Sequence, residues 1–332
     1  MTAATVTTTP VQRRALPVAT LWRIVVRKLL ELVGVVVTVT LITTVLIRLA
    51  PGSPASNILG DAASQESIDR LNQQLGLNDP LLVQVGRNLG QLFTGNLGSS
   101  IVQSRPVSSI VAQSLPITLT LILSAIVLAV VVGIPIGLAA GFSQKRGYDQ
   151  AVGVGTSLLI ALPPFVVGTL LIYLLAVNFK VFPAGGWGTN PVTIVEHLVL
   201  PAVTLAILIV SPIIRSVFRS TRDATGQEYV DAARSRGVSS LRIAFRHVLP
   251  VVSVPLITLL CYSAAILIGG AIIVEVVFGL PGFGQAINTA VLSRDYPTVA
   301  GMTLVVAVLV VLITTVGDLL TLVADPRRRL VK

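Results

Sequence analysis

Few residues of this chain have the types and spacing that catalysis or metal binding requires. Its single cysteine is Cys261, and its two histidines, His197 and His247, lie far apart in the sequence. No cluster of Cys, His, Asp and Glu residues has the spacing of a metal site, and neither a G-x-S-x-G nor an H-E-x-x-H motif occurs. A G-x-x-x-x-G-K-S/T phosphate loop is excluded because no lysine follows a glycine. The sequence therefore predicts no catalytic, cofactor-binding or metal-binding residue.

One charged stretch, residues 225–250, has a pattern that indicates a role, and it separates two strongly apolar segments. Glu228 and Asp231 precede Arg234 and Arg236 within it. Acidic residues near the start of a helix and basic residues near its end are both favoured by the helix dipole. We therefore expect a short helix over this part of the stretch.

Small residues set the limits and the profile of this expected helix. Gly226 can stand at its start, and Gly237 follows where a glycine commonly closes a helix. Ala232 and Ala233 give the helix a low profile, so that a partner surface can come close. We interpret the segment as a docking helix. The alternative is an amphipathic helix that lies on anionic lipid headgroups.

The composition indicates what surrounds this segment. The chain has 332 residues, of which 53% are hydrophobic and only 11% charged, whereas soluble domains carry about 25% charged residues. Apolar material in this excess has to be solvated by lipid. The sequence therefore predicts a membrane protein.

Six apolar runs are long enough to cross about 30 Å of hydrocarbon. The first is too long for the apolar core of a signal peptide, so we expect it to be an uncleaved membrane helix. The fold class that follows is an all-α polytopic membrane protein with six transmembrane helices. The runs are 29–49, 117–142, 151–177, 197–218, 248–274 and 298–323.

The distribution of charge predicts the orientation of these helices. With the N-terminus inside, the inside segments hold 18 of the 24 Lys and Arg residues and 7 of the 14 Asp and Glu residues, a net charge of +11 against −1 outside. Lys and Arg are retained on the cytoplasmic side of short loops. We therefore expect both termini, and the 225–250 stretch, in the cytoplasm.

This topology predicts five regions along the chain. The outer insert is expected to hold a helix over 64–75 and a second helix with Asp79 as N-cap and Pro80 at its first position. We interpret the insert as a cover over the bundle, and the alternative is a contact surface for a delivery protein. The regions are a cytoplasmic arm 1–28, a first transmembrane helix 29–49, an extracytoplasmic insert 50–115, a five-helix core 116–324 with a cytoplasmic loop 219–247, and a basic tail 325–332.

Three features inside the apolar runs carry further expectations. Gly133, Gly137 and Gly141 have the spacing that lets two helices approach closely. Glu275 lies near the end of a run and is interpreted either as a group at the outer mouth of a pathway or as a solvated or paired residue at a helix end. Prolines interrupt several runs and predict kinks. These are Pro135, Pro163, Pro164, Pro201, Pro212 and Pro255.

The docking segment resembles the cytoplasmic loop of permease subunits of ATP-binding-cassette (ABC) importers. Their signature is E-A-A, three residues, G, nine residues and I-x-L-P. Here Asp231-Ala232-Ala233 is followed at the same spacing by Gly237 and by residues 247–250, His-Val-Leu-Pro. Asp replaces Glu and His replaces Ile, and these departures leave the details of the contact open.

The resemblance extends over about 250 residues and concerns the B-type permeases of dipeptide and oligopeptide uptake systems. Each matching segment alone is weakly specific, but seven occur in the family's order. They are RLAPGSPA (48–55), LGLNDPLLVQ (75–84), GNLGSS (95–100), LPITLTL (115–121), EYVDAARSRG (228–237), GGAIIVEVVFGLPGFG (269–284) and RDYPTVAG (294–301).

The resemblance implies a subunit of a larger machine in the bacterial inner membrane. A second, similar permease, two ATPase subunits and an extracytoplasmic solute-binding protein are the implied partners, with no nucleic acid. The ATPases would hold ATP and magnesium, so this chain would be no enzyme and would need no cofactor. The implied mechanism is alternating access. The implied coupling residues are Glu228, Asp231, Ala232, Ala233 and Gly237.

Three other functions remain open at this stage. A member of the same family could import another solute, such as a nickel chelate or glutathione. An ion-coupled carrier or a channel acting alone is a second alternative, although such carriers need ionisable groups or broken helices near the membrane midplane. A structural or insertase-like membrane protein is the third, and it would leave the docking segment without a role.

Overall fold

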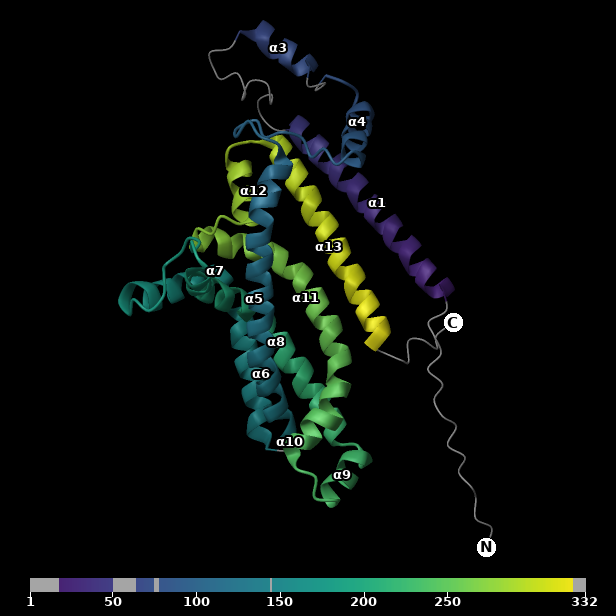
Figure 1. The fold of residues 1–332 in the computed structure, drawn as a ribbon, viewed down its shortest axis with the longest axis vertical. Helices are drawn as coiled ribbons and strands as arrows, with labels where there is room; N and C mark the ends of the chain where they lie inside the picture. The colour runs from purple at the N-terminus through teal and green to yellow at the C-terminus, as the bar shows by residue number, and fades with distance from the viewer. Residues whose placement is uncertain (1–17, 50–63, 75–77, 144, 325–332) are drawn as a thin grey trace.

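The computed structural model describes residues 18–49, 64–74, 78–143 and 145–324 (Figure 1). The predicted tail 325–332, most of the predicted arm 1–28 and the start of the outer insert lie outside the described residues. In the described part every regular element is a helix, apart from one isolated antiparallel bridge between Ser99 and Pro106. The prediction of an all-α fold is therefore confirmed.

The helices follow one another with short connections. The membrane-crossing candidates are α1 (Val18–Leu49), α5 (Val107–Phe142), α8 (Pro191–Thr225), α11 (Leu249–Phe278) and α13 (Tyr296–Ala324). The shorter helices are α3 (Gln65–Gln74), α4 (Leu81–Phe93), α6 (Arg146–Ala161), α7 (Pro164–Leu171), η1 (Ile172–Asn178), α9 (Glu228–Ser235), α10 (Ser240–Ile243), η2 (Ala244–Val248) and α12 (Phe283–Leu292).

The apolar run 151–177 is not the single transmembrane helix that its length predicts. It is a pair of helical segments, Gly147–Ala161 and Pro164–Asn178, bent by 89°. Pro163 and Pro164 cause the break, because proline lacks an N–H and its ring clashes with the preceding turn. Leu162 accordingly takes the extended conformation that a residue before proline favours (φ −82°, ψ 117°). The described residues thus form five long apolar helices and one bent pair.

The first helix begins earlier than its apolar run. α1 starts at Val18 rather than at residue 29, so the described part of the predicted cytoplasmic arm is helical. The basic residues of this arm continue the helix, and Arg27 and Lys28 each pair with Glu31 one turn further along (2.9 Å for both pairs). Hydropathy locates the part of a helix that lies in lipid but not the polar turns that extend it.

The core of the bundle is built around α8. In the most apolar part of α8, 67% of the residues are buried, against 11% for α1. α5 packs along α8 through the three glycines predicted to allow close approach: Gly133, Gly137 and Gly141 meet Ile213, Val217 and Thr221. The prediction that these glycines serve helix packing is confirmed. α11 and the bent pair pack on other sides of α8.

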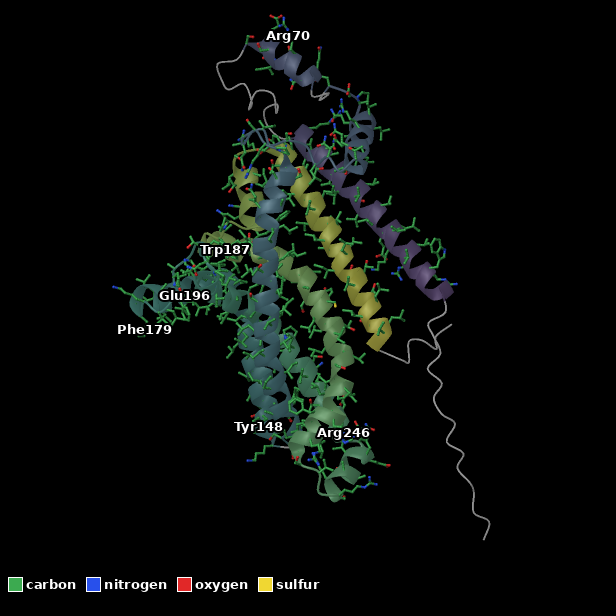
Figure 2. All side chains as sticks on the ribbon, in the orientation of Figure 1. Arg70, Tyr148, Phe179, Trp187, Glu196 and Arg246 are labelled. Carbon is green, nitrogen blue, oxygen red and sulfur yellow. The ribbon has the colours of Figure 1, made fainter. Side chains whose placement is uncertain are left out.

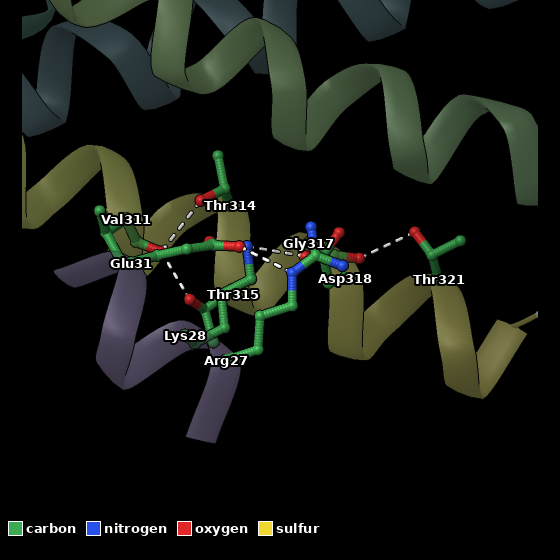
Figure 3. Close-up of polar contacts among 9 residues, drawn as sticks. All are labelled: Arg27, Lys28, Glu31, Val311, Thr314, Thr315, Gly317, Asp318 and Thr321. Carbon is green, nitrogen blue, oxygen red and sulfur yellow. Dashed lines mark hydrogen bonds and ion pairs between the residues drawn. The ribbon is translucent and has the colours of Figure 1, made fainter. Parts of the chain in front are cut away.

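α1 lies outside this core and is attached to α13. Figure 3 shows Lys28 of α1 beside Asp318 of α13. The Lys28 Nζ lies 2.9 Å from a carboxylate oxygen of Asp318 and 2.9 Å from one of Glu31. Near the other end of α1, the Asn88 amide of α4 donates to the Thr44 hydroxyl (3.3 Å). Polar contacts therefore fix this peripheral helix at both ends.

The predicted outer insert and the predicted cytoplasmic loop lie at opposite ends of the molecule, an arrangement that the predicted topology requires. Figure 1 shows α3 and α4 at one end and α9 and α10 at the other. The helix predicted over 64–75 is confirmed as α3. Asp79 is not the N-cap of the next helix, however, since α4 begins at Leu81 and its N-cap is Pro80, which makes no side-chain bond. The Asp79 carboxylate instead pairs with Arg87 (2.9 Å).

Candidate functional site

The candidate site is the helical loop between α8 and α11. α8 continues past the apolar run 197–218 as far as Thr225, so that the loop begins about two turns beyond the end of the run. Gln227 then adopts an extended conformation (φ −89°, ψ 143°), and α9 begins at Glu228. Glu228 and Asp231 lie in the first turn of α9 and Arg234 in its last turn. This is the order that the helix dipole favours.

Gly237 closes α9 in the predicted way. It follows the C-cap residue Arg236 with φ +75°, a left-handed conformation that glycine adopts without steric cost. Its N–H donates to the Arg234 carbonyl (2.9 Å), and the Val238 N–H donates to the Ala233 carbonyl (3.2 Å). These two bonds form the Schellman motif, which satisfies the last carbonyls of a helix. A β carbon on Gly237 would meet nothing within 4 Å, so backbone conformation rather than space calls for glycine here.

α9 has one buried face and one exposed face. Val230 is 0% exposed, and Ala233 is partly buried against the main hydrophobic core. Glu228, Asp231 and Ala232 are exposed. The five residues predicted for coupling are thus close together but have different surroundings. Ala233 packs on the protein itself, whereas the three exposed residues are accessible to a partner.

A ring contact connects α9 to the segment that leads into α11. The Tyr229 ring lies against the His247 ring of η2, with 6.3 Å between ring centroids and a tilt of 52°. η2 leads directly into α11, and its last residue, Val248, is 0% exposed. Sequence patterns gave no signal for the Tyr229–His247 contact or for the burial of Val230, because an eight-residue helix is too short to show a hydrophobic period.

The end of α8 that leads into this loop is bonded to α6 as well. The Arg222 guanidinium donates to the Asp149 carboxylate. Arg215 donates to the hydroxyls of Thr156 (2.6 Å) and Ser157 (2.9 Å). Figure 2 shows Arg246 of the loop and Tyr148 of α6 at the same end of the molecule, with Arg70 of α3 at the opposite end. Side-chain bonds therefore join α8, the helix that precedes α9, to α6.

Glu275, the residue predicted either for an outer mouth or for a helix end, is fully buried at 0% exposure. It accepts hydrogen bonds from the Thr118 hydroxyl of α5 (2.5 Å) and from the Gln285 backbone N–H of α12 (3.0 Å). Its surroundings are protein groups rather than an open channel in this structure. The sequence did not predict the role of Thr118, since Thr118 and Glu275 are far apart along the chain.

The site contains no feature of a metal centre. Among the described residues, no group of three or more His, Cys, Asp and Glu side chains is placed to hold a metal ion. Around α9 the exposed charged groups form one ion pair, between Asp231 and Arg234 (3.8 Å). The arrangement offers a small, mixed-charge contact surface on a rigid helix, and this chemistry suits docking of another protein.

Family models match almost the whole chain. Residues 133–330 match the model described as the binding-protein-dependent transport system inner membrane component. Residues 21–122 match the model for the N-terminal part of such membrane components. The division between the two models falls within α5.

Three relatives illustrate the range of named proteins. A peptide transport system permease of Brucella abortus is 34% identical over 309 residues, which cover 92% of this chain and 98% of the relative. An oligopeptide transport system permease of Bacillus subtilis is 33% identical and covers 91% of this chain and 98% of its own. A nickel import system permease of Staphylococcus aureus is 32% identical, with coverage of 91% and 90%.

Solved structures of one ABC transporter have a fold similar to that of this chain. An inward-facing conformation of the MetNI methionine ABC transporter aligns with a TM-score of 0.54 and 17% identity, covering 65% of this chain and 96% of the other. A second crystal form of the same transporter gives a TM-score of 0.55 and 16% identity, covering 66% of this chain and 97% of the other. At these identities the likeness concerns the fold alone.

Proposed function

Because this chain belongs to the family of inner membrane components of binding-protein-dependent transport systems, we propose that it forms half of the translocation pathway of an importer for dipeptides and oligopeptides. The chain is a multi-pass permease of the ABC importer class, located in the bacterial inner membrane. The peptide substrate, the set of partners and the coupling residues belong to the proposal. Each has a separate line of support.

The names of the relatives support a peptide substrate. The Brucella abortus and Bacillus subtilis relatives are peptide and oligopeptide permeases, and the identity extends over 91–92% of this chain. The nickel import permease of Staphylococcus aureus keeps a second substrate class open, such as a nickel chelate. Glutathione remains a third candidate within the same family.

The observation that carries the coupling proposal is the two-faced packing of α9. Its exposed face carries Glu228, Asp231 and Ala232, while Val230 on its other face is fully buried. An ATPase subunit seated on the exposed face would push on a helix that is already packed against α8 and α10 and that contacts η2 through Tyr229. Gly237 fixes the end of α9 and so its orientation.

The proposed partners follow from this arrangement and from the family. Two ATPase subunits hydrolyse ATP, because this chain has no phosphate loop. A second, similar permease completes the pathway, and an extracytoplasmic binding protein delivers the peptide. ATP and magnesium are held by the ATPases, so this chain acts without a cofactor of its own.

The mechanism that we propose is alternating access. Closure of the ATPase dimer displaces α9. The buried Val230 transmits the displacement to the core, and the Tyr229 ring transmits it through His247 to η2, which leads into α11. The population of inward-open and outward-open states can shift only if the ATPases bind the two states with different affinities. Because Gly237 fixes the end of α9, the displacement that the ATPases impose on this helix is passed on to the membrane helices.

Reconstitution in liposomes tests the proposal. The complete complex, with its binding protein outside and ATP inside, is expected to accumulate a labelled oligopeptide, and this chain alone is expected to transport nothing. Uptake by the chain alone would instead establish a carrier or a channel. Binding of a panel of peptides, a nickel chelate and glutathione to the purified binding protein distinguishes the substrate classes.

A further inference from the structure

Two acidic side chains are buried at the outer end of the bundle, far from α9. Glu275, in the last turn of α11, is 0% exposed, and Asp295, just before α13, is 2% exposed. Each bonds to a hydroxyl group between residues 100 and 118 and to the N-terminus of a helix. Neither contributes to the α9 surface, so their role lies outside the coupling site.

Glu275 joins α11, α5 and α12. It accepts from the Thr118 hydroxyl (2.5 Å) and from the N–H of Gln285, the third residue of α12 (3.0 Å). The Thr118 oxygen in turn accepts from the N–H of Phe283, the first residue of α12 (2.8 Å). N–H groups at a helix start have no partner within the helix, so Glu275 and Thr118 together replace a side-chain cap for α12. The N-cap residue itself, Gly282, has no side chain to make these bonds.

Glycines make room for this arrangement. A β carbon on Gly282 would lie 2.3 Å from the Glu275 carboxyl carbon, and one on Gly284 would lie 2.5 Å from the Ile272 Cα. Both distances are too short for any side chain at these positions. The backbone of α12 therefore lies directly against the acidic group, and this contact explains two glycines of the GLPGFG sequence (279–284).

Asp295 joins α13 to the turn that precedes α5. Its carboxylate accepts from the Thr298 hydroxyl (2.8 Å), from the Ser100 hydroxyl (2.5 Å) and from the Ile101 N–H (3.2 Å). Ser100 is held in a turn, since its N–H donates to the Arg105 carbonyl (2.9 Å). The start of α13 is thus attached to the chain segment that leads into α5.

An apolar cluster lies between the two acidic groups. Val107 and Ile110 of α5, Phe283 of α12 and Met302 of α13 are each 0–3% exposed and pack together. Gly301 lies so close to the loop before α5 that a β carbon there would be 2.8 Å from the Leu97 carbonyl oxygen. We define the outer unit as residues 97–118 together with residues 275–302. It is closely packed, and hydrogen bonds to a buried carboxylate hold it at each end.

Separating the helices of this unit would expose its buried polar groups or leave them without hydrogen-bond partners. Glu275 would lose the donors Thr118 and Gln285. Asp295 would lose the donors Ser100 and Ile101 and keep Thr298, which lies three residues further along the chain. A buried acidic group that loses its donors is strongly unfavourable. The start of α12 would lose its cap at the same time. Motions that leave these contacts intact cost far less, so the unit favours movement as one body.

We propose that the outer unit keeps its internal contacts throughout transport, and that the external entrance opens between this unit and the rest of the transporter rather than within it. Glu275 and Asp295 are then positioning residues that hold α12 in place and touch no substrate. This inference rests on the proposed alternating-access function.

A disulfide across the outer unit tests this directly. The Pro297 Cβ lies 3.8 Å from the position of a β carbon on Gly98, a separation typical of disulfides. A complex with Gly98→Cys and Pro297→Cys, in a Cys261→Ser background, is oxidised and compared with the reduced form. We expect no loss of peptide uptake on oxidation. Loss on oxidation that reduction reverses would overturn the proposal.

The controls separate this inference from the proposed function. The unmodified complex and each single-cysteine variant are assayed in parallel. Absence of ATP-driven uptake in the unmodified complex would contradict the proposed function, whereas uptake that is lost only in the oxidised pair would contradict only the rigid outer unit.

Variants of Glu275 provide an independent readout. Glu275→Ala removes the cap, and we expect the assembled complex to lose uptake while ATP hydrolysis continues without stimulation by the binding protein. Glu275→Gln keeps an oxygen for the Gln285 N–H and gains an amide that can donate to Thr118, so we expect it to restore uptake and stimulation. Normal uptake with Glu275→Ala, or loss with Glu275→Gln equal to that with Glu275→Ala, would contradict the positioning role.

Discussion

Gly137 of α5 lies directly against Val217 of α8. A β carbon on Gly137 would be 2.7 Å from the Val217 Cβ and 3.0 Å from the Ile214 carbonyl oxygen. Such distances are shorter than β carbons allow in folded proteins. The same relationship recurs one turn away in each direction, at Gly133 with Ile213 and at Gly141 with Thr221. The close contact between these two helices thus requires glycine, which has no β carbon, at three positions of α5.

Gly137→Ala should therefore destabilise the protein. Overpacking of a tight helix contact costs about 1–3 kcal/mol. The matched control is Gly153→Ala in α6, where a β carbon meets nothing within 4 Å. Alanine there should be neutral or stabilising, by up to about 1 kcal/mol. Thermal unfolding of the two variants in detergent measures the difference in stability. Equal transition temperatures would show that the α5–α8 contact can accommodate a β carbon at position 137.

This contact also illustrates how far the sequence could predict the fold. The spacing of the three glycines predicted a close helix contact, and the structure confirms it. The glycine spacing did not identify α8 as the partner helix, because any helix with small or β-branched residues at matching positions could pack there. The apolar runs likewise predicted the helices, but the bend at Pro163 and Pro164 and the start of α1 at Val18 depend on local backbone and polar contacts that hydropathy does not measure.

The candidate site shows the same division between local and long-range information. Gly237 predicted the end of α9, since a left-handed closing residue is a property of the local chain. The burial of Val230 and the bonding of Glu275 to Thr118 were not predictable, because each depends on residues distant in the sequence. Asp79 was expected as an N-cap from its position before Pro80. Its side chain instead pairs with Arg87, which is available once α4 has folded.

The contact of α1 with α13 yields a second prediction. The Lys28 side chain, only 14% exposed, contacts both Glu31 and Asp318. Lys28→Gln should lower the unfolding temperature and loosen α1, because two carboxylates are left without their shared cation. The control is Arg27→Gln, which removes a side chain that is 80% exposed and pairs with Glu31. An equal effect of the two substitutions would contradict a specific attachment through Lys28.

Gly237 yields a third prediction, on coupling. Gly237→Val should abolish the stimulation of ATP hydrolysis by the loaded binding protein, because a left-handed conformation costs a β-branched residue about 1–2 kcal/mol and distorts the end of α9. Gly237→Asn should keep most of the stimulation, since asparagine tolerates this conformation. Membrane insertion should be normal in both. Equal ATPase rates for the valine and asparagine variants would indicate that the end of α9 has no part in coupling.

The exposed face of α9 yields a fourth prediction. Ala232→Arg adds a large charged side chain where we propose that the ATPase binds, so it should reduce co-purification of the ATPase with this chain. Thr94→Arg places the same side chain on an exposed position next to α4, at the opposite end of the molecule. It should leave co-purification unchanged. Normal recovery of the ATPase with Ala232→Arg would rule out docking on this face.

The contact between Tyr229 and His247 yields the last prediction, on transmission from α9 to α11. Aromatic pairs of this kind contribute about 0.5–1.5 kcal/mol beyond their burial. If the displacement of α9 passes through this contact, Tyr229→Ala should reduce stimulated ATP hydrolysis, and Tyr229→Phe, which keeps the ring, should not. Adding His247→Ala to Tyr229→Ala should then cause little further loss, because the first substitution has already removed the shared contact. The rates of the two single variants and the double variant give the coupling energy. Fully additive losses would mean that the two rings act separately and that α11 receives the movement of α9 through the buried side of Val230 alone.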